Sequence, residues 1–416
     1  MKDKGSWLII IGLVITAGLF LVSKTVPDAP AFNFWQVLSQ MSSLSGGVLL
    51  AITFGLSSRI SWLEDWFGGL DKVYKKHHLL GGIAFSLLMA HPVLLAIKAI
   101  SVGGNGLLYL LPSTLLPYNL GVGAVYGLIL LLTFTLIIKL PYQSWLKTHQ
   151  LMGLVALMAF GHVLLIDSDV ARFWPLKLWM LGWMGLALAA VVYRKWLLNK
   201  TKTDYIVKKI NQFNKIIEIS LEAKNKEIKF RPGQFVFVSF KNKVTGEESH
   251  PFSIASAPEE KEIKLAIKMG GDYTDKLTGL KTGDVAEIIG PYGKMGEIFD
   301  GGKKIVVVAG GIGITPFLSM VGSEKEMTLF YSMRERNGYA DDRLTKIKTN
   351  NFAYFPVYTS EKQRLTGNFI KEKIGNFTDW TFLVCGPEAM MTDIQNQLID
   401  LGVDKLNIYY ENFYLG

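Results

Sequence analysis

The fold of this chain is decided by the stretch HHLLGGIAFSLLMAH at residues 77–91 and by a similar stretch, HQLMGLVALMAFGH, at residues 149–162. Each stretch begins and ends with histidine inside an apolar run, and histidine is costly at membrane depth. A helix rises about 1.5 Å per residue, so the end histidines of each stretch lie roughly 20 Å apart, about two thirds of a bilayer core of about 30 Å. The pattern predicts two membrane helices, each with a histidine near both membrane faces.

Four histidines in two matched pairs favour metal binding over simple packing. Neutral imidazole is a good iron ligand, and haem iron takes axial histidines. We expect His77 and His149 (the inner pair) to hold one haem, and His91 and His162 (the outer pair) to hold a second. The alternative is that these side chains bond across a helix bundle. His78 is an alternative to His77, and only the spacing of 14 residues to His91 distinguishes them.

The spacings within the two stretches differ, and the difference predicts a local distortion. Fourteen residues return to within about 40° of the same helix face, whereas 13 residues end roughly 140° away on a straight helix. The helix that carries His149 and His162 is therefore expected to bend, to bulge or to be approached from two sides. The same stretches contain glycines that either leave room for a flat macrocycle or allow close helix packing: Gly81, Gly82, Gly153 and Gly161.

The chain divides into an apolar half and a polar half. It has 416 residues, of which 50% are hydrophobic, and long uncharged runs are confined to the first half. We expect about six membrane spans by length and apolarity, at residues 6–23, 34–57, 77–101, 119–139, 149–166 and 174–197. The predicted domains are residues 1–200, 201–300 and 301–416.

The formal net charge of +9 does not indicate a nucleic-acid partner. Many basic residues flank hydrophobic spans, where they set orientation. They favour an orientation with both termini in the cytoplasm, so we expect a multi-pass protein of the cell (plasma) membrane, surrounded by the lipid bilayer. No obligate protein partner is evident from the sequence. We expect the first span to be retained, although Lys2 and Lys4 before it also fit a cleaved signal peptide. The single cysteine, Cys385, excludes an internal disulfide, a thiolate zinc cluster and covalent C-x-x-C-H haem attachment.

The polar half begins with a strand-rich region. Short β-branched and aromatic runs at residues 205–210, 216–223, 227–230 and 235–240 predict a small barrel. Four turn-like motifs accompany it, and their order carries more information than any one alone: RPGQF (231–235), HPFSIAS (250–256), MGGDYT (269–274) and GPYG (290–293).

After Gly302 strands and helices alternate. The apolar run at 304–309 predicts a buried parallel strand, and GGIGITP (310–316) follows it. Glycines let a backbone approach a pyrophosphate, and a helix N-terminus offers free amides. The strand at 327–331 leads to Arg334 and Arg336, either of which can pair with a 2′-phosphate and favour NADPH over NADH, or belong to a solvated charge run. The strand at 380–384 leads to Cys385, which we expect beside the nicotinamide and not as a nucleophile, because no base is visible near it.

These motifs together resemble the NADPH oxidase and ferric reductase superfamily, most closely its bacterial NADPH oxidase homologues, over nearly the whole chain. The resemblance implies a multi-domain membrane protein. A six-helix transmembrane haem bundle with two b haems precedes a ferredoxin-NADP-reductase-like unit, made of an FAD-binding β-barrel and an NADPH-binding α/β domain. It implies electron transfer from cytosolic NADPH (or NADH) through FAD and the haems to external dioxygen, giving superoxide, with a ferric chelate as the alternative acceptor. Two competing interpretations are a membrane haem protein that passes electrons to a periplasmic partner, and a transporter with a soluble regulatory domain.

The resemblance also assigns residues. It places Phe252 and Ser253 against the flavin, Thr274 at the FAD pyrophosphate, and Phe413 over the flavin ring, although Tyr414 competes for that place because three residues follow Phe413. Cys385 and Phe413 are the catalytic candidates. The other cofactor-binding candidates are Arg231, His250, Pro251, Lys268, Tyr273, Gly310, Gly311, Gly313, Thr315, Pro316, Arg334, Arg336, Gly386 and Pro387.

The chain departs from the eukaryotic oxidases at one position of the membrane half. Leu95 stands where they carry a further histidine, so we expect a different oxygen-side pocket. We find no calcium-binding loop in the sequence and expect no regulatory module.

Overall fold

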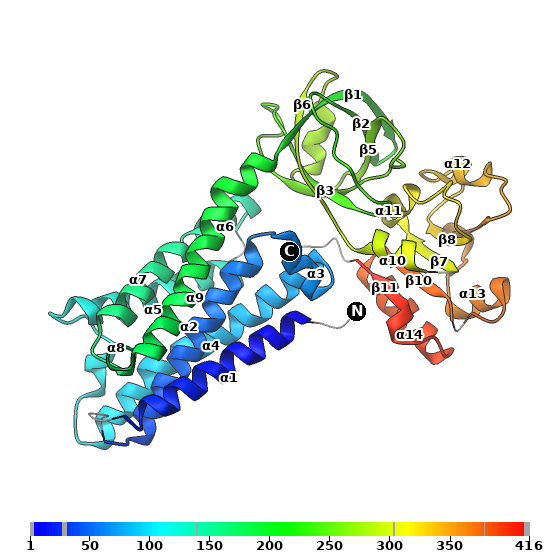
Figure 1. Ribbon diagram of the computed structural model, residues 1–416. Coiled ribbons are helices and arrows are strands. Elements are labelled where there is room, and N and C mark those ends of the chain that lie inside the picture. The colour runs from blue at the N-terminus through cyan, green and yellow to red at the C-terminus, as the bar shows by residue number, and fades with distance from the viewer. Residues whose placement is uncertain (1–3, 27–30, 139, 303, 378, 412–416) are drawn as a thin grey trace. The chain divides into compact units, whose positions relative to one another are not determined.

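The computed structural model describes residues 4–26, 31–138, 140–302, 304–377 and 379–411. These residues fall into two compact units (Figure 1). The helical unit lies within residues 2–67 and 72–197, and the sheet unit comprises residues 68–71 and the chain from 198 onward.

Within the described residues, six helices are long and apolar enough to cross a membrane, as the sequence predicts. They are α1 (Lys4–Ser23), α2 (Phe34–Ser57), α4 (Leu70–Ser101), α5 (Leu116–Leu136), the consecutive pair α6 (Tyr142–Gln150) and α7 (Met152–Leu165), and α9 (Trp174–Val192), which continues into a π-helical turn, Tyr193–Leu197. Two short helices, α3 (Ser61–Phe67) and α8 (Asp169–Arg172), join them. The third span begins at Leu70 and not at residue 77, because the charged segment before His77 continues the helix.

The predicted distortion between the second pair of histidines is present. His149 lies on α6 and His162 on α7, and the two helices are separated at Leu151, whose amide bonds to the carbonyl of Thr148 three residues earlier. A tighter turn of this kind rotates the following helix relative to the preceding one. The break therefore resolves the misfit of a 13-residue spacing, whereas α4 carries its two histidines on one continuous helix.

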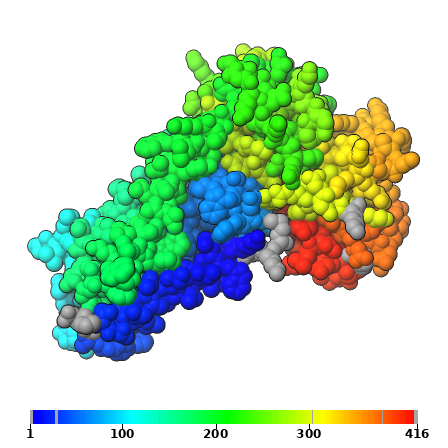
Figure 2. Space-filling view, viewed as in Figure 1, coloured from blue at the N-terminus to red at the C-terminus, as the bar shows by residue number. Residues whose placement is uncertain are grey.

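The helices pack along their lengths and leave an apolar exterior. Helix α9 contacts both α2 and α1, and α1 and α9 lie side by side on the face shown in Figure 2. A cluster that includes Phe85 and Val155 joins α4, α5 and α7. Large apolar side chains such as Trp7, Leu130 and Leu154 remain exposed. Contiguous exposed apolar surface on helices that satisfy their own backbone fits a lipid environment.

The sheet unit begins with a six-stranded antiparallel barrel. Its strands are β1 (Thr203–Phe213), β2 (Ile216–Ala223), β3 (Phe235–Phe240), β4 (His250–Ser253), β5 (Glu262–Lys268) and β6 (Val285–Tyr292), in the order β4-β3-β6-β1-β2-β5. A bridge between Ile254 and Leu265 brings the two outer strands together. The interior is apolar and fully buried at Leu221, Val238 and Ile288.

One predicted strand of the barrel is wrong. Residues 227–230 run beside the barrel without joining a sheet. The amide of Ile228 donates to the hydroxyl oxygen of Tyr205 at 2.8 Å, so a side chain takes the place of a strand partner. Ile228 and Phe230 still pack on the barrel core, which explains why their pattern resembles a strand.

The second part of the sheet unit is a parallel sheet with the order β11-β10-β7-β8-β9. The strands are β7 (Ile305–Gly310), β8 (Met327–Met333), β9 (Phe352–Tyr358), β10 (Thr381–Cys385) and β11 (Ile408–Tyr410). Val306 and Val307 of β7 belong to apolar clusters on opposite faces of the sheet, which accounts for the unbroken apolar run. Chain order reverses between β7 and β10, and sheets of this type bind ligands at the carboxyl ends of such strands.

Candidate functional site

The inner pair brings α4 and α6 together. The ring centres of His77 and His149 are 6.1 Å apart. The Nδ1 atom of His77 is 3.0 Å from the carbonyl oxygen of Thr53 on α2. His149 stacks on Trp145, one turn earlier on α6, with ring centres 5.2 Å apart. His78, the alternative ligand, is exposed, so the geometry favours His77.

The outer pair brings α4 and α7 together. The ring centres of His91 and His162 are 6.4 Å apart. The Nδ1 atom of His91 is 2.8 Å from the hydroxyl and 3.1 Å from the carbonyl oxygen of Ser39, a fully buried residue of α2. The Nδ1 atom of His162 is 2.8 Å from the carbonyl oxygen of Pro117 on α5. A carbonyl can only accept, so both rings donate from Nδ1, and Nε2 keeps its lone pair.

The ring separations would suit two imidazoles that bind one iron atom. A metal–nitrogen bond of about 2 Å, with roughly 1 Å more from each nitrogen to its ring centre, puts two such rings about 6 Å apart. Both observed separations agree with that value. Within the described ranges, no group of three or more His, Cys, Asp and Glu side chains converges as a metal site. Each pair therefore offers two protein ligands for an iron atom, and a macrocycle would supply the other ligands.

The glycines near the histidines serve two different purposes. A Cβ atom added to Gly81, Gly82 or Gly153 would meet nothing within 4 Å, so these glycines do not serve close helix packing and leave space in which a flat group would fit. Gly161 packs closely, since its Cβ would lie 3.1 Å from a leucine of α5. Gly121 was not anticipated: its Cβ would lie 2.8 Å from Nδ1 of His162, so only glycine lets that ring approach α5.

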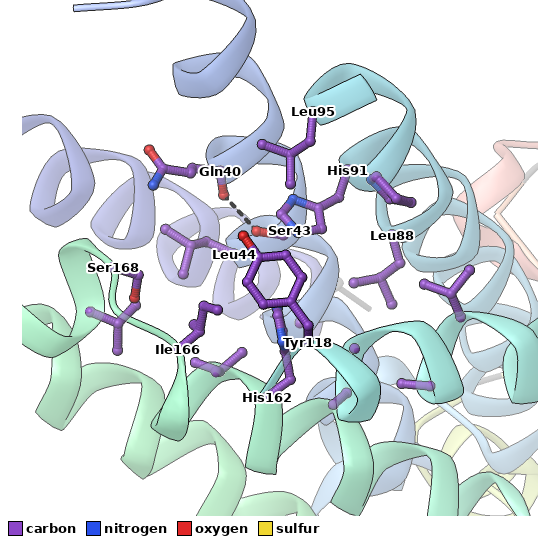
Figure 3. A pocket seen from close by; sticks show the side chains of 18 of the residues that line it. Gln40, Ser43, Leu44, Leu88, His91, Leu95, Tyr118, His162, Ile166 and Ser168 are labelled. Atoms are coloured by element: carbon purple, nitrogen blue, oxygen red, sulfur yellow. Dashed lines mark hydrogen bonds between the residues drawn. The ribbon is translucent and has the colours of Figure 1, made fainter. Parts of the chain in front are cut away.

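A cavity of about 290 Å³ opens beside the outer pair, a size just below the roughly 300–1,000 Å³ typical of ligand pockets. His91 and His162 point into it from α4 and α7, with Tyr118 and Leu95 on its walls (Figure 3). Leu95 occupies the position where the eukaryotic pattern has a histidine. The lining is mostly apolar, and Lys98 contributes its main positive charge on α4.

Sequence reasoning missed the groups that orient the imidazoles. Thr53 and Pro117 act through backbone carbonyls, which carry no residue-type signal. Ser39 is one of many small polar residues in its span. Trp145 was detectable, because a residue four positions before His149 on a helix lies against it.

On the barrel, the structure brings together the aromatic members of two predicted motifs. The ring of His250 on β4 stacks on Tyr273 at 3.8 Å, and Phe252 lies parallel to Tyr273 at 6.5 Å. Burial lowers the pKa of His250 and raises the pKa of Tyr273. Both groups are therefore neutral at pH 7. Next to them on β4 lie Pro251, which is half-buried, and Ser253, which is buried.

The remaining barrel candidates are positioned less distinctively. The hydroxyl of Thr274 accepts a hydrogen bond from the amide of Gly271 at 3.0 Å, which shapes the turn at 270–274. Lys268 is exposed at the end of β5. Arg231 is exposed and 3.8 Å from a carboxylate oxygen of Asp300. The structure does not bring Arg231 or Lys268 into the aromatic group.

The two loops predicted to bind the nicotinamide nucleotide meet at the reversal between β7 and β10. A Cβ on Gly313 would lie 2.5 Å from the carbonyl oxygen of Cys385, and a Cβ on Gly310 would lie 3.0 Å from Pro387. Gly386 packs against Gly310 in the same way, while Gly311 stays exposed. Thr315 and Pro316 are buried at the start of α11 (Thr315–Leu318), a helix of a single turn. Burial raises the pKa of the Cys385 thiol, which fits a neutral contact and not a nucleophile.

The two arginines after β8 have different surroundings. Arg336 bonds to both carboxylate oxygens of Glu361, at 2.6 and 3.2 Å, and lies over the ring of Tyr358. The side chain of Arg334 is 88% exposed and only 3.5 Å from its neighbour Glu335. Arg334 is therefore the candidate whose guanidinium is more open to a phosphate.

Glu411, the last described residue, follows β11 in the sheet unit. One of its carboxylate oxygens accepts hydrogen bonds from the amides of Lys294 at 2.8 Å and Met295 at 3.3 Å, directly after the GPYG turn. This anchors the chain end beside a predicted flavin motif. Phe413 and its competitor Tyr414 lie outside the described residues.

Three protein families match consecutive parts of the chain. Residues 42–160 match the ferric reductase like transmembrane component, residues 201–295 an FAD-binding domain and residues 307–396 an oxidoreductase NAD-binding domain. With the six apolar helices and the two sheets, these matches confirm the predicted fold class.

Individual relatives match mainly in part of the chain. A superoxide-generating NADPH oxidase heavy chain of Dictyostelium discoideum is 29% identical over 43% of this chain and 37% of its own length. A flavohemoprotein of Bacillus cereus is 28% identical over 50% of this chain and 60% of its own. The chain therefore spans less than two thirds of either relative. A ferredoxin NADP+ reductase structure from Neisseria gonorrhoeae is 20% identical, covering 51% of this chain and 99% of that one, with a TM-score of 0.45.

Proposed function

We propose that this chain, which belongs to the NADPH oxidase and ferric reductase superfamily, transfers electrons from NADPH across the cell membrane to dioxygen and so forms superoxide. The observation that carries the proposal is the pairing of four histidines at two places in the helical unit. The same chain contains FAD-binding and NAD-binding domains. A donor module and two successive metal-binding pairs are the parts that a transmembrane relay needs.

The inner and outer pairs would each hold one b haem. Ring separations of 6.1 and 6.4 Å and the open space beside Gly81 and Gly153 support this fit. When bound, haem iron supplies one-electron redox chemistry, and FAD divides the two-electron donation of NADPH into single steps. The chain fixes the tautomer and orientation of three of the four ligands, His77, His91 and His162. Thr53, Ser39 and Pro117 accept from Nδ1 and leave Nε2 free to bind.

In the sheet unit the loops at 310–316 and 385–387 would hold the nicotinamide nucleotide where they meet. Phe252 and Ser253 would contact the flavin and Thr274 its pyrophosphate, and Phe413 would cover the flavin ring. Cys385 would pack beside the nicotinamide as a neutral thiol. We assign Arg334 to the 2′-phosphate, because Arg336 is already held by Glu361.

The distribution of charge supports an orientation with both termini in the cytoplasm. Arg59, Lys76 and Arg194 accompany the inner pair, whereas Lys24 and Lys98 lie toward the other ends of their helices. Cytoplasmic segments carry the excess of Lys and Arg. The outer pair and its cavity would then face outward.

Dioxygen is the acceptor that the surroundings of the outer pair support best. His91 and His162 point into the cavity, so the outer haem would fill much of it, and the acceptor would meet that haem beside a wall that is mostly apolar and includes Leu95. Such a lining admits a small uncharged molecule more readily than a charged chelate. A ferric chelate is the second candidate, because Lys98 lines the same cavity and can attract an anionic complex, although Asp167 and Asp169 also line it.

The experiment is an NADPH-driven assay on the purified chain with added FAD. Cytochrome c reduction is measured with and without superoxide dismutase, in air and under nitrogen, and haem spectra are recorded in the same cuvette. We expect dismutase to abolish the signal in air and the haems to remain reduced under nitrogen. Reduction of ferric chelates without oxygen, together with no effect of dismutase, would replace the oxidase by the ferric reductase.

A further inference from the structure

The loop at residues 334–340 joins β8 to α12 (Asp341–Thr345). The hydroxyl of Tyr331, near the end of β8, lies 3.1 Å from the carbonyl oxygen of Gly311 and 3.3 Å from that of Tyr339. Tyr331 thus links this loop to the glycine loop that would hold the nicotinamide nucleotide. Both loops follow adjacent parallel strands, and sheets of this type bind ligands at the carboxyl ends of their strands.

A buried carboxylate holds the loop from the protein side. Asp341 is only 3% exposed. One of its oxygens accepts from the hydroxyl of Tyr354 at 2.7 Å, and the other accepts from the hydroxyl of Tyr358 at 3.1 Å and from the amide of Asn337 at 3.1 Å. Burial and the bonds to Asp341 raise the pKa of both tyrosines, so their hydroxyls stay protonated and donate. Hydrogen bonds to an ionised acceptor are strong, and three of them fix this carboxylate.

The loop that Asp341 holds has a strained backbone. Asn337 has a φ of 59° and Ala340 a φ of 66°, in the left-handed region that residues with a Cβ seldom adopt. A Cβ on Gly338 would lie 2.8 Å from the sulfur of Met333, so the loop folds closely onto the end of β8. Such conformations persist only where their surroundings hold them, and they concentrate at functional sites.

Arg336 supports the same network, and Arg334 is carried by it. The guanidinium carbon of Arg336 lies 5.0 Å from the ring centre of Tyr358, whose hydroxyl bonds to Asp341. The carbonyl oxygen of Arg334 accepts from the amide of Ser360 at 2.9 Å, while the side chain of Arg334 is 88% exposed. The network therefore fixes the backbone of Arg334 and leaves its guanidinium accessible.

We propose that Asp341 is a positioning residue that sets the preference for NADPH over NADH, by holding the loop at 334–340 in the conformation that presents Arg334 to the 2′-phosphate. This inference rests on the proposed function for the assignment of Arg334 to that phosphate. Asp341 is buried and would act through the loop, not by contact with the nucleotide. A preorganised guanidinium loses less entropy when it binds a phosphate. The alternative is that Asp341 only stabilises the α/β domain, which predicts no change in preference.

The test is the steady-state reduction of ferricyanide by the full chain with FAD, driven by NADPH or by NADH. Ferricyanide takes electrons from reduced flavin, so turnover does not require the haems. We expect Asp341→Ala to raise the KM for NADPH about tenfold, the loss typical of a charge-assisted hydrogen bond. The KM for NADH and both kcat values should not change, because only ground-state binding is weakened. Arg334→Ala should give a loss of the same kind.

The double variant Arg334→Ala/Asp341→Ala tests whether Asp341 acts through Arg334. Its KM for NADPH should exceed that of Arg334→Ala only slightly, because both changes remove one interaction. Affinity for 2′,5′-ADP, measured by calorimetry without turnover, should fall in both single variants, whereas affinity for 5′-ADP should not.

Matched variants separate position from stability. Asp342→Ala changes the exposed neighbour of Asp341 and should behave as the parent. Asp341→Asn retains one acceptor oxygen and should recover part of the preference. If Asp341→Ala does not fold, Tyr354→Phe removes one donor to the carboxylate and should lower the preference in the same direction by a smaller factor.

Two results would overturn the inference alone. The first is an unchanged preference in Asp341→Ala, with thermal stability lowered and the preference lost in Arg334→Ala. The second is a fully additive loss in the double variant. An unchanged preference in Arg334→Ala would overturn the 2′-phosphate assignment together with the inference, and no flavin reduction by either nucleotide would contradict the proposed function itself.

Discussion

The outer and inner pairs each bring two histidines together but hold them differently. At the outer pair both rings are fixed through Nδ1, His91 by Ser39 and His162 by Pro117. At the inner pair only His77 is fixed in this way. The Nδ1 atom of His149 is buried and has no hydrogen-bond partner among the described residues.

This difference follows from the positions of His149 and His162 on their helices. His149 lies two residues before the break at Leu151 and leans on Trp145, whereas His162 lies within α7 and reaches across to α5. A hydrogen bond to Nδ1 fixes both tautomer and ring orientation, while aromatic stacking fixes orientation alone. The outer site is thus preorganised on both sides, and the inner site on one.

The largest expected effect comes from replacing one histidine of each pair, which tests the order of the two pairs in the proposed relay. His91→Leu and His77→Leu should each lower reduction of the external acceptor by more than about 100-fold, because loss of a ligand exceeds the roughly 10- to 100-fold cost of losing its hydrogen-bond partner. Under nitrogen, NADPH should still reduce the haem that remains in His91→Leu, but not the one that remains in His77→Leu. Rapid-mixing absorbance measures both.

His78→Leu is the control for these variants, because it changes an exposed histidine next to a ligand. It should retain full activity and haem content. Equal reduction of the remaining haem in His77→Leu and His91→Leu would contradict an ordered relay from inner to outer pair.

A second prediction uses the close approach of Gly121 to His162. The Cβ of Gly121→Ala would lie 2.8 Å from Nδ1, so the ring must leave its place and its bond to Pro117. We expect loss of most of the outer haem and retention of the inner one, measured by haem-to-protein ratio. Gly18→Ala, where a Cβ meets nothing within 4 Å, is the control. Normal outer haem content in Gly121→Ala would show that the ring has room to adjust.

A third, smaller effect is expected at Ser39. Ser39→Ala removes the hydroxyl 2.8 Å from His91 Nδ1 and leaves the backbone carbonyl as acceptor. Outer haem affinity should fall by up to about tenfold, and its midpoint potential should rise because the ligand becomes less basic. Ser86→Ala is the control, since that hydroxyl bonds only to its own helix. A shift confined to the inner haem would reverse the assignment of the pairs.

The smallest effect concerns Trp145. Trp145→Ala removes the stacking partner of His149, an interaction worth about 0.5–1.5 kcal/mol, and should weaken inner haem binding a few-fold. Trp145→Phe should retain most of it. Haem loss during dilution of the purified protein measures this, and an equal loss from both pairs would remove any specific role for the ring.

Much of this arrangement was predictable, and the exceptions have physical causes. The spans and the histidine pairs follow from apolar length and helical spacing, and a distortion between His149 and His162 follows from a count of 13 residues, although its position at Leu151 does not. The strand at 227–230 was predicted wrongly, because its alternating pattern reports burial, which a segment lying on a barrel also has. The carbonyl groups that bond to His77 and His162, and the role of Gly121, depend on how neighbouring helices pack, and no local sequence pattern predicts that packing.

In the sheet unit, the order and spacing of the sequence motifs predicted that the loops at residues 310–316 and 385–387 lie close together. Gly313 and Cys385 are far apart in sequence and adjacent in the fold because β7 and β10 are neighbours at the reversal of strand order. The sequence left Arg334 and Arg336 equivalent, since the distinction comes from Glu361, which lies beyond the next strand.

The most direct test of the two-pair arrangement is the haem content and low-temperature absorption and EPR spectra of the purified chain and of four single variants, His77→Leu, His149→Leu, His91→Leu and His162→Leu. We expect two low-spin haems per chain. We also expect the first two variants to lose one and the same haem, and the last two to lose the other. A single haem per chain, or four variants with indistinguishable spectra, would contradict the two-pair arrangement on which the proposed relay depends.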